Sequence, residues 1–267
     1  RQRMKVIQLS DLHLPRTPDA ELFGSSPLAR LELVIDGILA AHADADFCLL
    51  TGDLADTGSD EAYAALAAAL RRLPMPAYLL PGNHDSRNAL RRHFPQLPAD
   101  DDCFMQAALA TPAGHFLLLD TVEAGAPWGS YCARRRAWLA QQLATTSDEP
   151  LWIAMHHPPL ALGIPSMDQF ALRDAEALWS VIAPHKSRIR HLFFGHLHRP
   201  IGGNWRGIPF SCTSSPNHQV ALDLTTLRGD EVPGCREPAG FAVILIDVDS
   251  VVVHHQQLFG GETTFWL

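Results

Sequence analysis

Side chains that can ligate metal ions occur in five short stretches of this chain, and each stretch directly follows an apolar, strand-like run. One Pro-Gly-Asn turn alone would mean little, because these residues are ordinary turn formers. Five strand ends that all carry oxygen or imidazole donors indicate one shared site. The stretches are Asp11-Leu12-His13, Gly52-Asp53, Gly82-Asn83-His84-Asp85, His156-His157 and Gly195-His196-Leu197-His198.

The donors in these stretches mix carboxylate, amide and imidazole groups. Seven such donors are too many for one four-coordinate zinc ion. They suit two borderline ions such as Mn, Fe, Zn or Co, provided that one carboxylate bridges them. Two such ions can clamp a phosphoryl group for in-line displacement and activate a shared water. The seven donors are Asp11, His13, Asp53, Asn83, His156, His196 and His198.

Alternating strands and helices must position these donors. Apolar periodicity predicts helices over 27–41, 60–73, 87–94, 133–143 and 174–182, and strands over 4–9, 47–50, 77–80, 104–108, 114–119, 151–155 and 189–194. Residues 160–170 are expected to form a loop. Further strands are expected over 201–205, 208–212, 241–248 and 250–258.

This order of elements predicts an α/β fold (an α+β sandwich) in which helices flank β-sheets. We expect one domain over residues 1–267, with a β-rich C-terminal part over 200–267. In such sheets the ligand site lies beyond the carboxyl ends of the strands, so the donors should converge on one sheet edge.

The composition limits the classes of partner that this chain is expected to bind. Of the 267 residues 47% are hydrophobic, and the formal net charge is −8. This charge argues against binding a nucleic acid polymer or an anionic membrane through bulk electrostatics. No apolar run approaches the ~18 residues of a membrane span. The five cysteines form no close pair and no signal peptide is evident, so free thiols and a cytoplasmic location are expected.

The ordered motifs between residues 11 and 198 resemble those of the calcineurin-like metallophosphoesterase superfamily. They are Asp-x-His, Gly-Asp, Gly-Asn-His-Asp, His and Gly-His-x-His. The segment 155–168, with Met-His-His-Pro-Pro, Gly-Ile and Met-Asp, resembles the class III cyclic nucleotide and glycerophosphodiester phosphodiesterase branch. The segment 214–220 matches a later part of that branch loosely.

The resemblance implies a ligand set for two metal ions and a bridging Asp53. The first ion would be held by Asp11, His13 and His198. The second would be held by Asn83, His156 and His196, with His157 on the other side of the chain.

The resemblance also implies roles at the substrate. His84 would contact the phosphate and protonate the leaving oxygen, and Asn83 would also lie at the substrate. Asp85 would either hold the His84 ring or cap the following helix. His218 would touch substrate at the site opening. Purple acid phosphatases carry Tyr where this chain has Asp56, so a tyrosinate–iron site is not expected.

The resulting hypothesis is a phosphodiesterase that hydrolyses small phosphodiesters, cyclic nucleotides or glycerophosphodiesters, by in-line attack of a metal-bridging hydroxide. One rival is a phosphomonoesterase or protein phosphatase with the same site. Another is an inactive binding scaffold, which should lack some of the donors that are present here. A DNA nuclease is disfavoured by the net charge.

Three further expectations concern the remainder of the chain. A homodimer is predicted from the β-rich part and its apolar tail, residues 263–267. Asp120 ends a strand and serves either the site or a simple turn. The run Arg134-Arg135-Arg136 opens a helix and should form a solvated face.

Overall fold

Two β-sheets packed face to face form the centre of the computed structural model, which describes residues 3–100, 103–146 and 148–258. The five-stranded sheet has the order β13-β12-β1-β2-β3, and the six-stranded sheet has the order β4-β5-β6-β7-β9-β8. The first contains β1 (Met4–Leu9), β2 (Phe47–Thr51), β3 (Ala77–Leu80), β12 (Ala239–Ile246) and β13 (Val251–Leu258). The second contains β4 (Ala107–Thr111), β5 (Gly114–Leu119), β6 (Leu151–Met155), β7 (Ile189–Phe194), β8 (Ile201–Trp205) and β9 (Ile208–Cys212).

The central strands of both sheets run parallel, β1 with β2 and β3, and β5 with β6, β7 and β9. Their apolar runs suit strands that are buried on both faces. In β2, Phe47 and Leu49 face the other sheet, whereas Cys48 and Leu50 face the helices. The sheets meet through aromatic packing, with the rings of Phe47 and Phe116 5.2 Å apart and edge to face.

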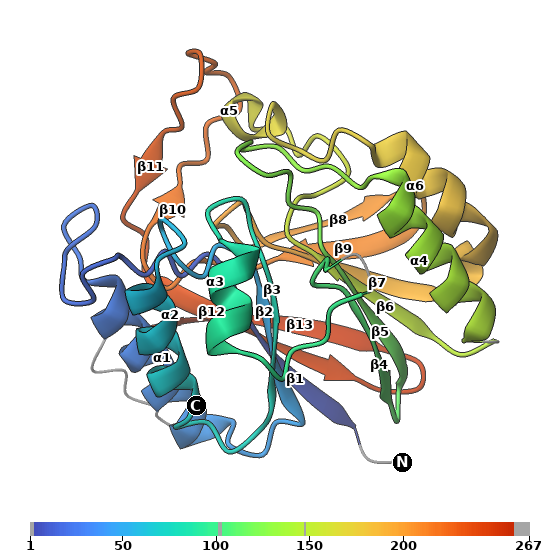
Figure 1. Cartoon of the computed structure of the whole chain (residues 1–267), viewed down its shortest axis with the longest axis horizontal. Helices are drawn as coiled ribbons and strands as arrows, with labels where there is room; N and C mark the ends of the chain where they lie inside the picture. The colour runs from blue at the N-terminus through green and yellow to red at the C-terminus, as the bar shows by residue number, and fades with distance from the viewer. Residues whose placement is uncertain (1–2, 101–102, 147, 259–267) are drawn as a thin grey trace, which may run out of the picture.

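Helices cover the two outer faces (Figure 1). Helices α1 (Pro27–Ala41), α2 (Asp60–Leu70) and α3 (Arg87–His93) pack on the five-stranded sheet, and α4 (Ala133–Thr145) and α6 (Ala175–Ile182) pack on the six-stranded sheet. Ser26, Ser59 and Ser86 cap the first three helices, each accepting a hydrogen bond from a first-turn amide. The short elements are α5 (Pro165–Asp168), the 3₁₀ helix η1 (Ala183–Arg188) and the pair β10 (Gln219–Val220) and β11 (Gly234–Cys235).

The expected fold class, sheets flanked by helices, is the one observed. Differences are local: the helix expected over 60–73 ends at Leu70, and the loop expected over 160–170 contains α5. The strand expected over 104–108 lies at Ala107–Thr111, because the Met105 amide donates to Asp120 Oδ2 rather than to a neighbouring strand.

The β-rich C-terminal part completes both sheets. Strands β8 and β9 extend the six-stranded sheet, and β12 and β13 extend the other. The apolar tail over 263–267 lies outside the described residues. Among the helices that the structure describes, none is long and apolar enough to cross a membrane.

Candidate active site

The donor-bearing turns follow β1, β2, β3, β6 and β7 and meet at the carboxyl ends of these strands. Parallel strands present these ends at the same edge, and the packing of the two sheets brings the edges together. Asp11, His13, Asp53 and His198 offer ligand atoms that all lie within 4.8 Å of one another. His156, with His157 and His196, forms a second such group. The structure therefore joins turns that are far apart in the sequence.

Three histidines have their ring protons fixed by oxygen acceptors. His156 Nδ1 lies 2.7 Å from the Thr51 carbonyl, and His198 Nδ1 lies 2.9 Å from the His218 carbonyl. His13 Nδ1 lies 3.1 Å from a carboxylate oxygen of Asp56. Carbonyl and carboxylate oxygens only accept, so Nδ1 donates in each case and the neutral ring keeps a lone pair on Nε2.

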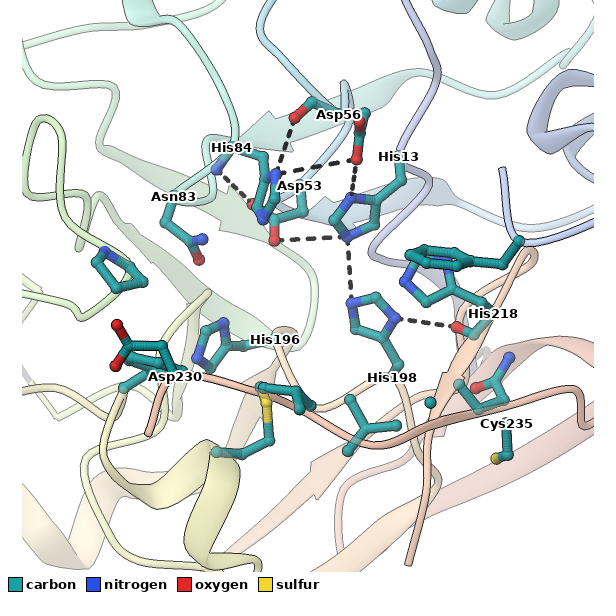
Figure 2. Close-up of a pocket in the computed structure, with 18 of the residues that line it drawn as sticks. His13, Asp53, Asp56, Asn83, His84, His196, His198, His218, Asp230 and Cys235 are labelled. Carbon is teal, nitrogen blue, oxygen red and sulfur yellow. Dashed lines mark hydrogen bonds and ion pairs between the residues drawn. The ribbon is translucent and has the colours of Figure 1, made fainter. Parts of the chain in front are cut away.

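These Nε2 lone pairs lie close to one another and to Asp53, and Figure 2 shows the arrangement for His13, His198 and Asp53. His13 Nε2 lies 3.2 Å from His198 Nε2, although neither atom carries a proton to share in the neutral rings. Asp53 Oδ2 lies 3.6 Å from His13 Nε2 and 3.3 Å from His156 Nε2. Close lone pairs and a carboxylate oxygen repel unless a cation, either a proton or a metal ion, lies among them, so these residues fit a bound metal ion.

The second group of donors also fits a cation. Asn83 Oδ1 lies 3.2 Å from His156 Nε2, and the buried Nε2 of His196 has no hydrogen-bond partner. An unpartnered buried nitrogen is costly, whereas a metal ion would use its lone pair. His157 Nδ1 lies 2.8 Å from the Thr121 hydroxyl, which fixes this ring beside the group.

Backbone amides orient the two carboxylates. Asp53 Oδ1 accepts from the His84 amide at 2.9 Å, which leaves Oδ2 for the centre of the site. The Asp11 carboxylate accepts from the His196 amide at 3.0 and 3.1 Å. Burial raises the pKa of Asp11 to about 6. Burial lowers the pKa of His156, but the nearby carboxylates of Asp53 and Asp11 outweigh it and raise this pKa to about 9. The positive ring then holds the pKa of Asp53 well below its usual value, although burial would raise it. A metal ion at Nε2 would take the place of that proton.

Backbone strain is concentrated at the donors. A non-glycine residue with φ near +60° is uncommon, and such strain gathers where a site over-determines the geometry. Five of the seven donors adopt this left-handed conformation. They are Asp11 (57°), His13 (46°), Asp53 (50°), His196 (72°) and His198 (50°).

Glycines stand beside the donors because the turns touch one another. A Cβ on Gly82 would lie 2.2 Å from Asp53 Oδ1, and one on Gly195 would lie 2.4 Å from the Thr51 carbonyl oxygen. Real Cβ contacts are not this short, so only glycine lets the turns approach. The glycines in the motifs therefore serve the close packing of the site.

His84 and Asp85 differ in their surroundings. His84 Nδ1 lies 2.8 Å from the Asp56 carbonyl, and its half-exposed side chain faces the cavity. The interpretation that Asp85 holds the His84 ring is wrong in this structure, because the Asp85 carboxylate binds other groups. The interpretation that Asp85 caps the following helix is also wrong, because Ser86 caps α3. Asp85 accepts from the amides of Gly82, Leu54 and Ala55 and from the Tyr63 hydroxyl.

A cavity of about 710 Å³ opens over the site. It is lined by donors such as His13 and Asn83 and by His218, whose ring centroid lies 4.7 Å from that of His198. His218, the residue expected at the site opening, thus lines the cavity. Lining residues that sequence reasoning missed include Phe23, Asp230 and Arg236, which lie in segments without a recognisable motif.

A partly buried ion pair supports the segment that follows His84. Arg87, three residues after His84, donates from Nε and Nη2 to the two oxygens of Asp120, both at 2.7 Å. Arg135 donates to the Asp120 carbonyl oxygen at 2.9 Å. The expectation of a solvated face is therefore wrong for Arg135, which is only 2% exposed. Asp120 anchors the turn rather than reaching the donors.

The comparisons with known proteins agree with this fold and site. The family model of the calcineurin-like phosphoesterases matches residues 4–200. A probable cyclic nucleotide phosphodiesterase of Rhodopseudomonas palustris is 39% identical over 254 residues, covering 94% of this chain and 91% of the relative. A probable glycerophosphodiester phosphodiesterase of Arcobacter nitrofigilis is 30% identical, covering 83% and 81%.

The fold is also found among solved structures. A dimetal phosphatase from Danio rerio superposes with a TM-score of 0.72 at 15% identity, covering 95% of this chain and 96% of that chain. The chain belongs to the calcineurin-like phosphoesterase family. The resemblance to its cyclic nucleotide and glycerophosphodiester phosphodiesterase branch is confirmed, and with it the prediction that the protein is an enzyme.

Proposed function

We propose that the protein is a metal-dependent phosphodiesterase acting on small phosphodiesters, either 3′,5′-cyclic nucleotides or glycerophosphodiesters. The single observation that carries this proposal is the convergence of His13, His156 and His198 Nε2 lone pairs on Asp53. The printed functions of the relatives support the diester as substrate.

Seven side chains would hold two ions of Mn, Fe, Zn or Co, three to each ion with Asp53 between them. Asp11, His13 and His198 would form one set, and Asn83, His156 and His196 the other. The bound ions would offset charge on the phosphoryl oxygens and activate a water for in-line attack.

His84 would act as the acid. A new bond forms between the attacking oxygen and phosphorus, the bond to the leaving oxygen breaks, and that oxygen takes a proton from His84 Nε2. The acid form carries hydrogen on both ring nitrogens, and the Asp56 carbonyl accepts the one on Nδ1. The Asp56 carboxylate also lies 4.0 Å from Nδ1 of this ring. His218 would contact the substrate beside it.

The test uses the metal-stripped protein, Mn²⁺ and bis(p-nitrophenyl) phosphate. Asn83→Ala should lose metal, whereas His84→Ala should keep metal and lose roughly 10²- to 10⁴-fold in turnover of a diester with an alkoxide leaving group, because p-nitrophenolate departs without a proton. Asn88→Ala, an exposed amide on α3, is the matched control. Absence of metal-dependent turnover would refute the proposal, and a fully active Asn83→Ala variant would refute the second ligand set.

The rival phosphomonoesterase is tested in the same assay with p-nitrophenyl phosphate. Monoester rates far above diester rates would favour it. We further propose a homodimer in the cytoplasm, where the five cysteines, all free in the structure, stay reduced. A monomeric mass in light scattering would contradict the dimer.

A further inference from the structure

Phe23 combines an exposed aromatic ring with a strained backbone at the rim of the cavity. Its φ is 54°, a left-handed conformation that is unusual for a bulky residue. Its relative exposure is 63%, so burial of the ring does not repay this strain. Strained residues that the core does not need are typical of ligand contacts.

The turn around Phe23 is held in place by hydrogen bonds. Leu22 and Ser25 pair through their backbones, with the Leu22 amide 2.8 Å from the Ser25 carbonyl oxygen. The Ser25 hydroxyl donates to Asn217 Oδ1 at 2.5 Å. The Arg236 guanidinium lies beside Gly24, 2.6 Å from the point where a Cβ on this glycine would stand. The ring is therefore presented by a fixed turn.

The ring of Phe23 stands close to the histidines of the site. Its centroid lies 4.6 Å from that of His218, which in turn lies 5.0 Å from that of His13. Phe23 is thus within about 10 Å of a proposed ligand ring. A group joined to a phosphate at the site through one sugar can reach that distance.

The chemistry of the lining suits a flat group with polar edges. A nucleobase has apolar faces, and Asp230 and Arg236 offer an acceptor and donors for its edges. A glycerol group carries hydroxyls and no flat apolar face, so contact with this apolar lining would add little to its binding affinity. The other apolar residues of the lining are Pro127, Met167, Phe170, Val220 and Val232.

We propose that Phe23 stacks on the nucleobase of a 3′,5′-cyclic nucleotide and so determines specificity for cyclic nucleotides over glycerophosphodiesters. This inference rests on the proposed phosphodiesterase function and names its substrate class. Phe23 would lie away from the reacting phosphate, so it would act by binding the base. Stacking on an aromatic ring changes base affinity by roughly 5- to 140-fold when the ring is removed.

The experiment compares kcat/KM for cyclic AMP and for glycerophosphoglycerol, which has neither ring nor cation. Phe23→Leu should lower the ratio of the two values by about 5- to 140-fold, mainly through KM for cyclic AMP. Phe23→Tyr, which keeps the ring, should restore the ratio. Leu224→Ala removes an exposed leucine that does not line the cavity, and the ratio should not change.

Product inhibition gives a second readout that does not depend on cleavage of glycerophosphoglycerol. Phe23→Leu should weaken inhibition by 5′-AMP by a similar factor and leave inhibition by inorganic phosphate as it was. Equal losses for all substrates, or a larger loss for glycerophosphocholine through a ring–cation contact, would overturn the inference. A wild-type enzyme that cleaves diesters but not cyclic AMP would also overturn it, whereas a protein that cleaves no diester refutes the proposed function itself.

Discussion

Replacing Gly82 by Ala tests whether the strand-end turns interlock as the structure indicates. The new Cβ would lie 2.2 Å from Asp53 Oδ1 and 2.3 Å from the Asp53 backbone nitrogen. Ordinary contacts begin near 3.4 Å, so the two turns must separate by at least about 1 Å. The backbone nitrogen cannot rotate away as a flexible side chain could.

The displaced residue is the carboxylate between the two proposed ligand sets. A misplacement of about 1 Å at a catalytic site can cost on the order of 10²-fold in rate. Overpacking of a close-packed interior costs about 1–3 kcal/mol of stability. Gly82→Ala should therefore bind less metal, lose roughly 10²-fold in kcat/KM and unfold at lower urea concentration.

The assay measures metal content, hydrolysis of bis(p-nitrophenyl) phosphate and urea unfolding on the same preparation. Gly202→Ala is the matched control, because a Cβ at Gly202 in β8 meets nothing within 4 Å. The control should behave as the wild type. A Gly82→Ala protein with wild-type metal content and turnover would refute the reasoning that close approach of the turns positions Asp53.

Two further predictions concern buried charge. Asp120→Asn should lower the free energy of unfolding in urea by about 3–5 kcal/mol, because it leaves the Arg87 guanidinium without its carboxylate. Asp36→Asn breaks an exposed pair and should lower the same free energy by at most about 1 kcal/mol. Burial lowers the pKa of His191 to about 4, so the unfolded chain takes up a proton near pH 6.5 and the folded chain does not. Between pH 7 and pH 5 the wild type should therefore lose about 2 kcal/mol more stability than His191→Gln.

A specific experimental result would contradict each of these two predictions. If Asp120→Asn and Asp36→Asn cost the same, the Arg87 pair contributes no more than a surface pair. If wild type and His191→Gln lose stability in parallel on acidification, His191 is not held neutral by burial. Both measurements use the metal-stripped protein at matched ionic strength, so that metal release does not contribute to the pH dependence.

Most elements of the fold could be predicted from local pattern. Apolar periodicity gave the helix Pro27–Ala41 and the strand Gly114–Leu119 with the observed bounds. It misplaced the strand at Ala107–Thr111, because the side chain that recruits the Met105 amide, Asp120, lies on another strand. A hydrogen bond between distant residues has no signature in a local window.

The candidate site could be predicted as a set of donor types. Strand-end motifs identify Asp53 and His156 as donors. They do not show that the Asp53 oxygen stands 3.3 Å from His156 Nε2 while its partner oxygen accepts the His84 amide. Neighbouring turns determine which Asp53 oxygen faces the site and which one accepts the amide. The same holds for Asp85. The motif places this residue beside His84, but its carboxylate accepts hydrogen bonds from backbone amides of another turn.

The sequence by itself determined most of the strands and helices and the residue types that end the strands, because periodicity and turn chemistry are local properties. Only the tertiary structure decided which atoms meet. Packing of two sheets brings turns from opposite halves of the chain within hydrogen-bond distance. It thereby assigns the Nδ1 protons, buries Arg135 against Asp120 and places the exposed ring of Phe23 at the rim of the cavity. These depend on contacts between residues far apart in the chain, which no spacing of motifs encodes.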